Sequence, residues 1–118
     1  DYSVFEGMYF PNHYAADDTA EAVVNFRTAY EAAYGETPNA LAALAYDGAK
    51  IMLNALKDVD ATGVALGPDS YAAVVEALKA TNIDGVTGNI TFDENNNPVK
   101  DVAIIKIENG AYKFYSKY

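Results

Sequence analysis

The spacing of apolar residues predicts three helices in the central part of the chain. In residues 20–34 and 40–59, apolar side chains recur every three or four positions, which is typical of a helix with one buried face. A third helix follows Gly67-Pro68, with Asp69 or Ser70 as its cap. The buried face of the second helix is predicted to comprise Leu41, Leu44, Ala45, Gly48, Met52, Ala55, Leu56 and Val59, and that of the third Tyr71, Val74, Val75 and Leu78.

The two ends of the chain show strand patterns instead. Residues 4–10 predict a strand that ends at Pro11, and residues 90–92 alternate apolar and polar side chains. Residues 102–107 form a β-branched run, after which Asn109-Gly110 is the signal of a type I′ turn to a return strand. The predicted fold class is α/β, in the order strand, three helices, strand and β-hairpin.

Residues that favour helix ends lie at the expected boundaries. Gly35 can adopt the left-handed conformation that ends a helix, and Thr37-Pro38 offers a capping oxygen followed by a residue suited to a first helical turn. Asp18 and Glu21 have the spacing of an acidic capping box. The sequence thus predicts that Asp18 caps the first helix and Thr37 the second.

Composition excludes several classes of function. The formal net charge is −9 with a single arginine, which disfavours binding to nucleic acid or to an anionic membrane. The chain has no cysteine and one histidine, His13, so thiolate sites, histidine-rich metal sites and a catalytic triad are excluded. We therefore expect no catalytic residue, no metal and no cofactor. No apolar stretch is long enough to span a membrane.

Two polar segments are candidates for ligand binding. Residues 93–97 carry oxygen-bearing side chains as a calcium loop does, but Pro98 stands where that loop needs glycine, so a polar hairpin turn is the better interpretation. In open α/β sheets, ligands bind beyond the carboxyl ends of strands. The loop containing Asn12 and Tyr14 is therefore a candidate binding edge, with an ordinary surface loop as the alternative.

A series of short motifs, in order along nearly the whole chain, resembles one protein family. These motifs are Glu6-Gly7-Met8-Tyr9, Asn12-His13-Tyr14, Asn25-Phe26, Tyr34-Gly35-Glu36-Thr37-Pro38, Ala40-Leu41-Ala42, Tyr46-Asp47, Phe92-Asp93-Glu94-Asn95 and Ile104–Gly110. The chain is similar to the C-terminal third of type I periplasmic solute-binding proteins of ABC importers, in the branched-chain amino acid class. The resemblance implies a C-terminal fragment of the periplasmic binding protein-like I fold.

The same resemblance implies how such a protein works. Two lobes would close about a hinge on a branched-chain or other small amino acid and deliver it to an ABC permease. Residues 1–11 and 101–118 would belong to the C-terminal lobe, and residues 12–100 to the N-terminal lobe. A ligand-contacting position of the family falls on Leu41, beside Ala40, where leucine suggests an aliphatic contact. The family's anchors for the α-carboxylate and α-amino groups lie upstream of residue 1.

Location and partners follow from the same resemblance. The protein would be extracytoplasmic, either in the periplasm or lipid-anchored on the outer face of the cytoplasmic membrane.

The alternatives to a transport function are a ligand-sensing extracellular receptor domain of the same fold and a structural or interaction domain without a ligand. Because the apolar helix faces are wide and the predicted strands few, we also expect the separate chain to self-associate.

Overall fold

A computed structural model describes residues 2–118 of the chain. Its three α-helices are α1 (Glu21–Tyr34), α2 (Ala40–Asp60) and α3 (Tyr71–Lys79). Short 3₁₀ turns, η1 (Ser3–Phe5) and η2 (Pro68–Ser70), precede the first strand and the last helix. The strands are β1 (Tyr9–Asn12), β2 (Asn82–Gly85), β3 (Gly88–Phe92), β4 (Pro98–Lys100), β5 (Ala103–Glu108) and β6 (Ala111–Lys117). This is the predicted α/β class.

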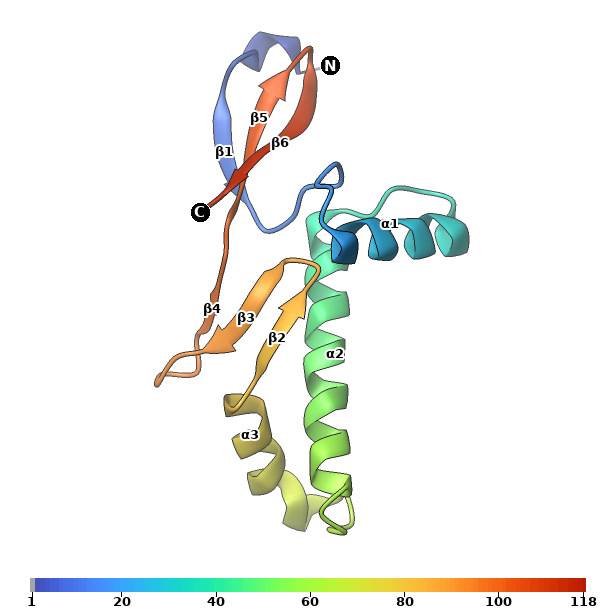
Figure 1. Cartoon of the computed structure of the whole chain (residues 1–118), viewed down its shortest axis with the longest axis vertical. Helices are drawn as coiled ribbons and strands as arrows, with labels where there is room; N and C mark the ends of the chain where they lie inside the picture. The colour runs from blue at the N-terminus through green and yellow to red at the C-terminus, as the bar shows by residue number, and fades with distance from the viewer. Residues whose placement is uncertain (1) are drawn as a thin grey trace.

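The strands form two separate antiparallel sheets, each with three strands, in the orders β1-β5-β6 and β2-β3-β4. The long helix α2 is the axis of the molecule: α1 crosses one end of it, and α3 and the β2-β3-β4 sheet lie along its length (Figure 1). The β1-β5-β6 sheet projects beyond the α1 end of the molecule. In that sheet Phe10 pairs with Ile105, which in turn pairs with Phe114.

The core consists of two small clusters rather than one. The cluster between the helices contains Tyr14, Val23, Phe26, Ala43 and Val86, and the cluster on the β1-β5-β6 sheet contains Ala15, Ala103 and Ile105 with Phe10 and Phe114 packed against them. Neighbouring residues Tyr14 and Ala15 thus belong to different clusters. The loop that carries them joins two parts of the molecule that each have their own packing.

The molecule is extended and exposes more surface than its mass requires. It measures 56 × 34 × 21 Å with a radius of gyration of 17.2 Å, whereas a compact domain of this length has about 13–14 Å. Its accessible surface is 7690 Å², against about 6,200 Å² for a compact protein of 12.7 kDa. Much apolar side-chain surface therefore remains uncovered.

The buried stripe of α2 differs from the predicted one. The structure buries Ala43, Asp47, Ile51, Ala55 and Val59, which recur at every fourth position. Leu41 and Met52, which were predicted to face inward, are 74% and 44% exposed. The apolar pattern is wide enough to cover two faces, and only one of them meets a neighbouring element here. In α3 no side chain is fully buried, and the predicted inward residues Tyr71 and Val75 are exposed.

Several boundaries also differ from those predicted. Asn39 caps α2 by accepting a hydrogen bond from the backbone N–H of Ala42 at 3.0 Å, so the prediction of Thr37 was wrong. Ala20 occupies the cap position of α1 without a side-chain bond, because the Asp18 carboxylate accepts from the Ala20 N–H instead. The first strand is shorter than predicted and includes Pro11. Strands β2 and β4 were not predicted.

The two predicted turns with left-handed residues are confirmed. Gly35 ends α1 with φ +72°. Asn109 and Gly110 both have positive φ, 55° and 68°, as a type I′ turn requires. The return strand β6 follows this turn, somewhat longer than predicted.

Candidate ligand-binding site

The four predicted site residues lie near the crossing of α1, α2 and the loop that follows β1. Asn12 ends β1, Tyr14 follows two residues later, and Ala40 and Leu41 are the first two residues of α2. Tyr14 and Ala40 belong to the same cluster, because Ala40 packs against it. The structure therefore brings part of the predicted set together at the N-terminal end of α2.

Tyr14 is a buried residue of this cluster. Its side chain is 4% exposed, and its ring meets that of Phe26 edge-on at 6.1 Å between centroids. Its hydroxyl has no hydrogen-bond partner in the structure. Burial raises the pKa of this phenol; the positive charge of Arg27 opposes this effect, and the negative charge of Glu31 reinforces it. The ring of Tyr14 therefore packs at the edge of the candidate site, and its hydroxyl is a polar group without a hydrogen-bond partner there.

Leu41 and Asn12 are more accessible. Leu41 is 74% exposed at the N-terminal end of α2, an apolar side chain with little protein around it. The Asn12 side chain is half-buried, and its carbonyl oxygen accepts the N–H of His13 at 2.8 Å. The two residues could contact a small molecule only together with further groups, because neither lies in an enclosed cavity of this chain.

A large hollow lies elsewhere, between α1, α2 and β2. Its volume is about 830 Å³, and none of the four predicted residues lines it. Its walls are mainly apolar and aromatic, and the amide and charged side chains among them are Asn25, Lys50 and Asp84. The remaining wall residues are Ala22, Phe26, Ala29, Tyr30, Tyr34, Ala42, Ala45, Tyr46 and Val86. Helix faces that the apolar spacing predicts to be buried contribute to these walls. In the structure Phe26 and Val86 are buried there, whereas Tyr34 and Tyr46 are exposed.

A buried carboxylate fixes the β2–β3 turn against α2. Asp47, which is 1% exposed, accepts the backbone N–H groups of Val86 at 2.9 Å and Thr87 at 2.8 Å. Gly85 lets the turn approach this closely, since a Cβ atom there would lie 2.7 Å from the carboxylate. This contact was not predicted from the sequence, where its one signal is an acid within an apolar helical stripe.

Lys100, at the end of β4, lies close to the same carboxylate. Partial burial lowers the pKa of its ammonium group, while the negative charges of Asp47 and Asp101 act in the opposite direction. Its Nζ donates to the backbone carbonyl of Asp101 at 2.9 Å. The negative charge of Asp47 thus acts electrostatically on this lysine.

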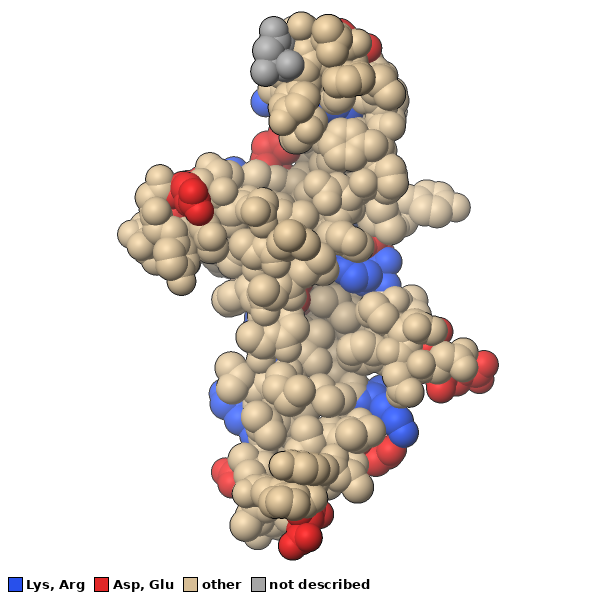
Figure 2. Space-filling model, turned by 180° about the vertical axis from the view of Figure 1, so that it is seen from behind, with Lys and Arg blue, Asp and Glu red and all other residues tan. Residues whose placement is uncertain are grey.

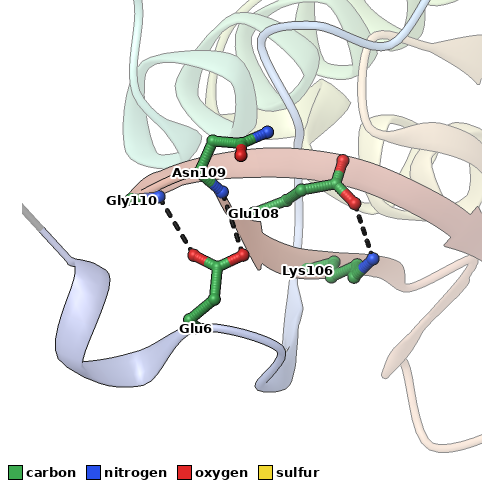
Figure 3. A network of polar contacts seen from close by, with 5 residues as sticks. All are labelled: Glu6, Lys106, Glu108, Asn109 and Gly110. Atoms are coloured by element: carbon green, nitrogen blue, oxygen red, sulfur yellow. Dashed lines mark hydrogen bonds and ion pairs between the residues drawn. The ribbon is translucent and has the colours of Figure 1, made fainter.

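A second carboxylate holds the turn of the other hairpin. Glu6 accepts the N–H groups of Asn109 at 3.0 Å and Gly110 at 3.1 Å, and next to it Lys106 donates to Glu108 at 2.6 Å (Figure 3). The segment that contains Glu6 is thereby tied to the turn of the β5–β6 hairpin.

Charged side chains of both signs are spread over the face drawn in Figure 2. Acidic side chains lie mostly at the two ends and on the side lobes, and basic side chains lie near the middle. Within residues 2–118 no group of three or more histidine, cysteine, aspartate or glutamate side chains could hold a metal ion. None of the helices in this range has the length and hydropathy needed to cross a membrane.

Comparison with known proteins identifies the family. The model of the periplasmic binding protein family matches residues 2–111, nearly the whole chain. The chain belongs to the periplasmic binding protein family. This confirms the resemblance seen in the short motifs, and a family of binding proteins agrees with the expectation that the chain is not an enzyme. No curated protein matches the chain.

Solved structures of periplasmic binding proteins share this fold. A protein from Rhodospirillum rubrum, provisionally described as a branched-chain amino acid ABC transporter, is 30% identical with a TM-score of 0.77, over 94% of this chain and 31% of that one. A leucine-binding protein from Thermotoga maritima is 29% identical with a TM-score of 0.73, over 96% and 31%. A solute-binding protein from R. palustris, solved with benzoate, is 19% identical with a TM-score of 0.79, over 96% and 30%, and shows the fold alone.

This periplasmic binding protein chain therefore spans about a third of the length of these structures. That share agrees with the C-terminal third implied by the resemblance. The proteins it resembles were solved with, or are described as binding, different solutes, so fold and family do not by themselves name a ligand.

Proposed function

We propose that this chain is part of the extracytoplasmic solute-binding component of an ABC importer, which captures a small amino acid by closing two lobes around it. The observation that carries this proposal is the family match over residues 2–111. The similarity to a leucine-binding protein at 29% identity supports an amino acid over other solutes. Delivery of the solute to a membrane permease, and location in the periplasm or on a lipid anchor, belong to the same proposal.

The division into lobes that we propose has support in the packing. Residues 1–11 and 101–118 would belong to the C-terminal lobe, and residues 12–100 to the N-terminal lobe. The separate sheets β1-β5-β6 and β2-β3-β4 agree with this division, and so does the pair of core clusters. A ligand between the lobes would favour the closed form by contacting both.

We further propose that Leu41 contacts the ligand, with Ala40, Asn12 and Tyr14 around it. An exposed leucine at a helix N-terminus presents an aliphatic surface that suits the side chain of leucine, isoleucine or valine. The anchors for the charged end of an amino acid would come from the rest of the full-length protein. Ligand binding therefore requires that longer chain.

Calorimetry of the full-length protein against a panel of amino acids tests this proposal. We expect binding of at least one branched-chain amino acid, and about tenfold weaker binding by Leu41→Ala, because the variant loses roughly 1–2 kcal/mol of apolar contact. Met52→Ala is the matched control, since Met52 is also an exposed apolar residue of α2 and lies outside the predicted site. If no amino acid binds, the ligand class is wrong, and if Leu41→Ala binds as the wild type does, the site is wrong.

We also propose that the separate chain of 118 residues self-associates through the apolar hollow between α1 and α2. Its accessible surface of 7690 Å² exceeds the compact value by roughly 1,400 Å², and a stable interface needs only about 800 Å² from each partner. Light scattering of the isolated chain should give a mass above 12.7 kDa. A monodisperse monomer that binds no hydrophobic dye would contradict this proposal.

A further inference from the structure

The two packed parts of the molecule are joined by two short crossings of the chain. We call residues 2–12 and 103–118 the terminal unit, and residues 20–100 the central unit. The crossings are the loop of residues 13–19 and the segment of residues 101–102. In the first crossing, Tyr14 is buried in the cluster of the central unit and Ala15 in the cluster of the terminal unit. A change of angle between the units must therefore bend or shift this loop.

The last strand, β6, makes polar contacts to both crossings. Asp17 accepts the backbone N–H of Phe114 at 2.9 Å, and the Asp18 carboxylate lies 3.0 Å from the ammonium of Lys117. In the second crossing, Val102 exchanges two backbone hydrogen bonds with Tyr118, each 2.9 Å long. One strand end thus holds both chain crossings at once.

The carboxylate of this ion pair is better protected than those of the pairs Lys79–Glu76 and Lys106–Glu108. The side chain of Asp18 is 8% exposed, against 71% for Glu76 and 46% for Glu108, and Lys117 is 36% exposed. The second oxygen of Asp18 accepts the N–H of Ala20, so both carboxylate oxygens are occupied. Because protection from water strengthens a charge interaction, this pair can help to hold β6 against the loop of residues 13–19. An exposed pair would contribute little.

We propose that Asp17, Asp18 and Lys117 form a hinge latch that holds the terminal unit at one angle to the central unit. The inference rests on the proposed function, since only a protein that closes two lobes needs a defined resting angle. Lobe closure then has to rotate the units against these contacts. The strength of the latch sets the fraction of molecules that adopt the closed form without solute. That fraction in turn sets part of the apparent affinity for the solute.

Distance measurements between spin labels test the latch without any solute. The chain has no cysteine, so cysteines can be placed at two exposed positions, Lys113→Cys in the terminal unit and Asp60→Cys in the central unit. Labelled chain is diluted into excess unlabelled chain, so that distances between associated copies do not contribute. We expect one narrow distance for the otherwise unchanged sequence.

Two variants remove the ion pair while keeping the shape of the side chains. Lys117→Met retains the length of the side chain without its charge. Asp18→Asn retains the oxygen that accepts from Ala20 but not the negative charge. In both variants we expect the loss of the single narrow distance and a broad distribution in its place. The double variant should be no broader than either single one, because both remove the same pair.

Lys79→Met is the matched control, since its ion pair lies entirely within α3. It should leave the narrow distance unchanged, and circular dichroism should show the same helix content in all variants. A broad distribution without any substitution, an unchanged distribution in Lys117→Met and Asp18→Asn, or equal broadening by Lys79→Met would each overturn the latch. Because no solute is present, such a result leaves the solute-binding proposal to be judged by calorimetry.

Discussion

Two carboxylates in this chain make the same contact in opposite surroundings. Asp47 and Glu6 each accept two consecutive backbone N–H groups from a hairpin turn that is distant in sequence. Asp47 does so at 1% exposure between α2 and the β2–β3 turn, while Glu6 is exposed beside the β5–β6 turn. In water, a released N–H finds a new partner at once, but a buried one does not. Two contacts with the same geometry can therefore contribute very differently to the free energy of unfolding.

The largest expected effect is that of Asp47→Ala. The substitution removes two hydrogen bonds and leaves the N–H groups of Val86 and Thr87 buried without an acceptor, so we expect a loss of roughly 3–5 kcal/mol in the free energy of unfolding. Urea unfolding followed by circular dichroism measures it. Asp47→Asn retains one accepting oxygen and should lose less. A loss below about 1 kcal/mol for the alanine variant would mean that water reaches this turn.

The next effect comes from the glycine that lets the turn approach Asp47. In Gly85→Ala the new Cβ would lie 2.7 Å from the carboxylate, so we expect a loss of about 1–3 kcal/mol as the turn is pushed away. Gly48→Ala is the matched control, because nothing lies within 4 Å of its Cβ position. That control should be neutral or stabilise by up to about 1 kcal/mol, since alanine favours a helix. Equal effects at the two glycines would contradict the close approach.

Glu6→Gln should have a smaller effect than either change at the buried contact. The variant keeps one accepting oxygen, and the exposed N–H of Asn109 or Gly110 can bind water instead, so we expect a loss of about 0.5–1 kcal/mol. The same urea titration measures it. A loss as large as that of Asp47→Ala would show that exposure does not decide the difference between the two carboxylates.

The smallest effect concerns the pair beside Glu6. The hydrogen bond from Lys106 lowers the pKa of the Glu108 carboxyl below its ordinary value of 4.5. Because the folded state holds the carboxylate more strongly, its contribution is present above that value and is lost as the pH falls through the lower pKa. Glu108→Gln should remove a slight fall in stability below about pH 4.5. Urea midpoints of both proteins across that range measure it, and parallel curves would contradict it.

The sequence predicted elements with local signals and missed those that depend on distant contacts. Asn109-Gly110 determines its turn by its own backbone preferences, and the structure has that turn. Strands β2 and β4 have weak patterns of their own and are held by pairing with β3. The role of Asp47 was also beyond reach, because its partners Val86 and Thr87 lie 39 and 40 residues away.

The candidate site was predictable only in part, for a related reason. The motifs identified the family, and the family match confirms them. Apolar spacing could not tell which of two faces of α2 is covered, because the pattern is apolar on both, and it therefore placed Leu41 inside. That Leu41 contacts a solute stays a prediction from the family resemblance.

The tie between Glu6 and the β5–β6 turn also has a consequence for the order of folding. Glu6 and Asn109 are 103 residues apart in sequence. The β5–β6 hairpin, in contrast, closes through a turn of two residues. Each doubling of loop length adds about 0.6 kcal/mol of entropic cost to closure, so the hairpin forms early and β1 is added late. Until then one edge of β5 is unpaired, and neighbouring chains can pair with it. We therefore expect the arrival of the N-terminal segment to cover this edge of β5.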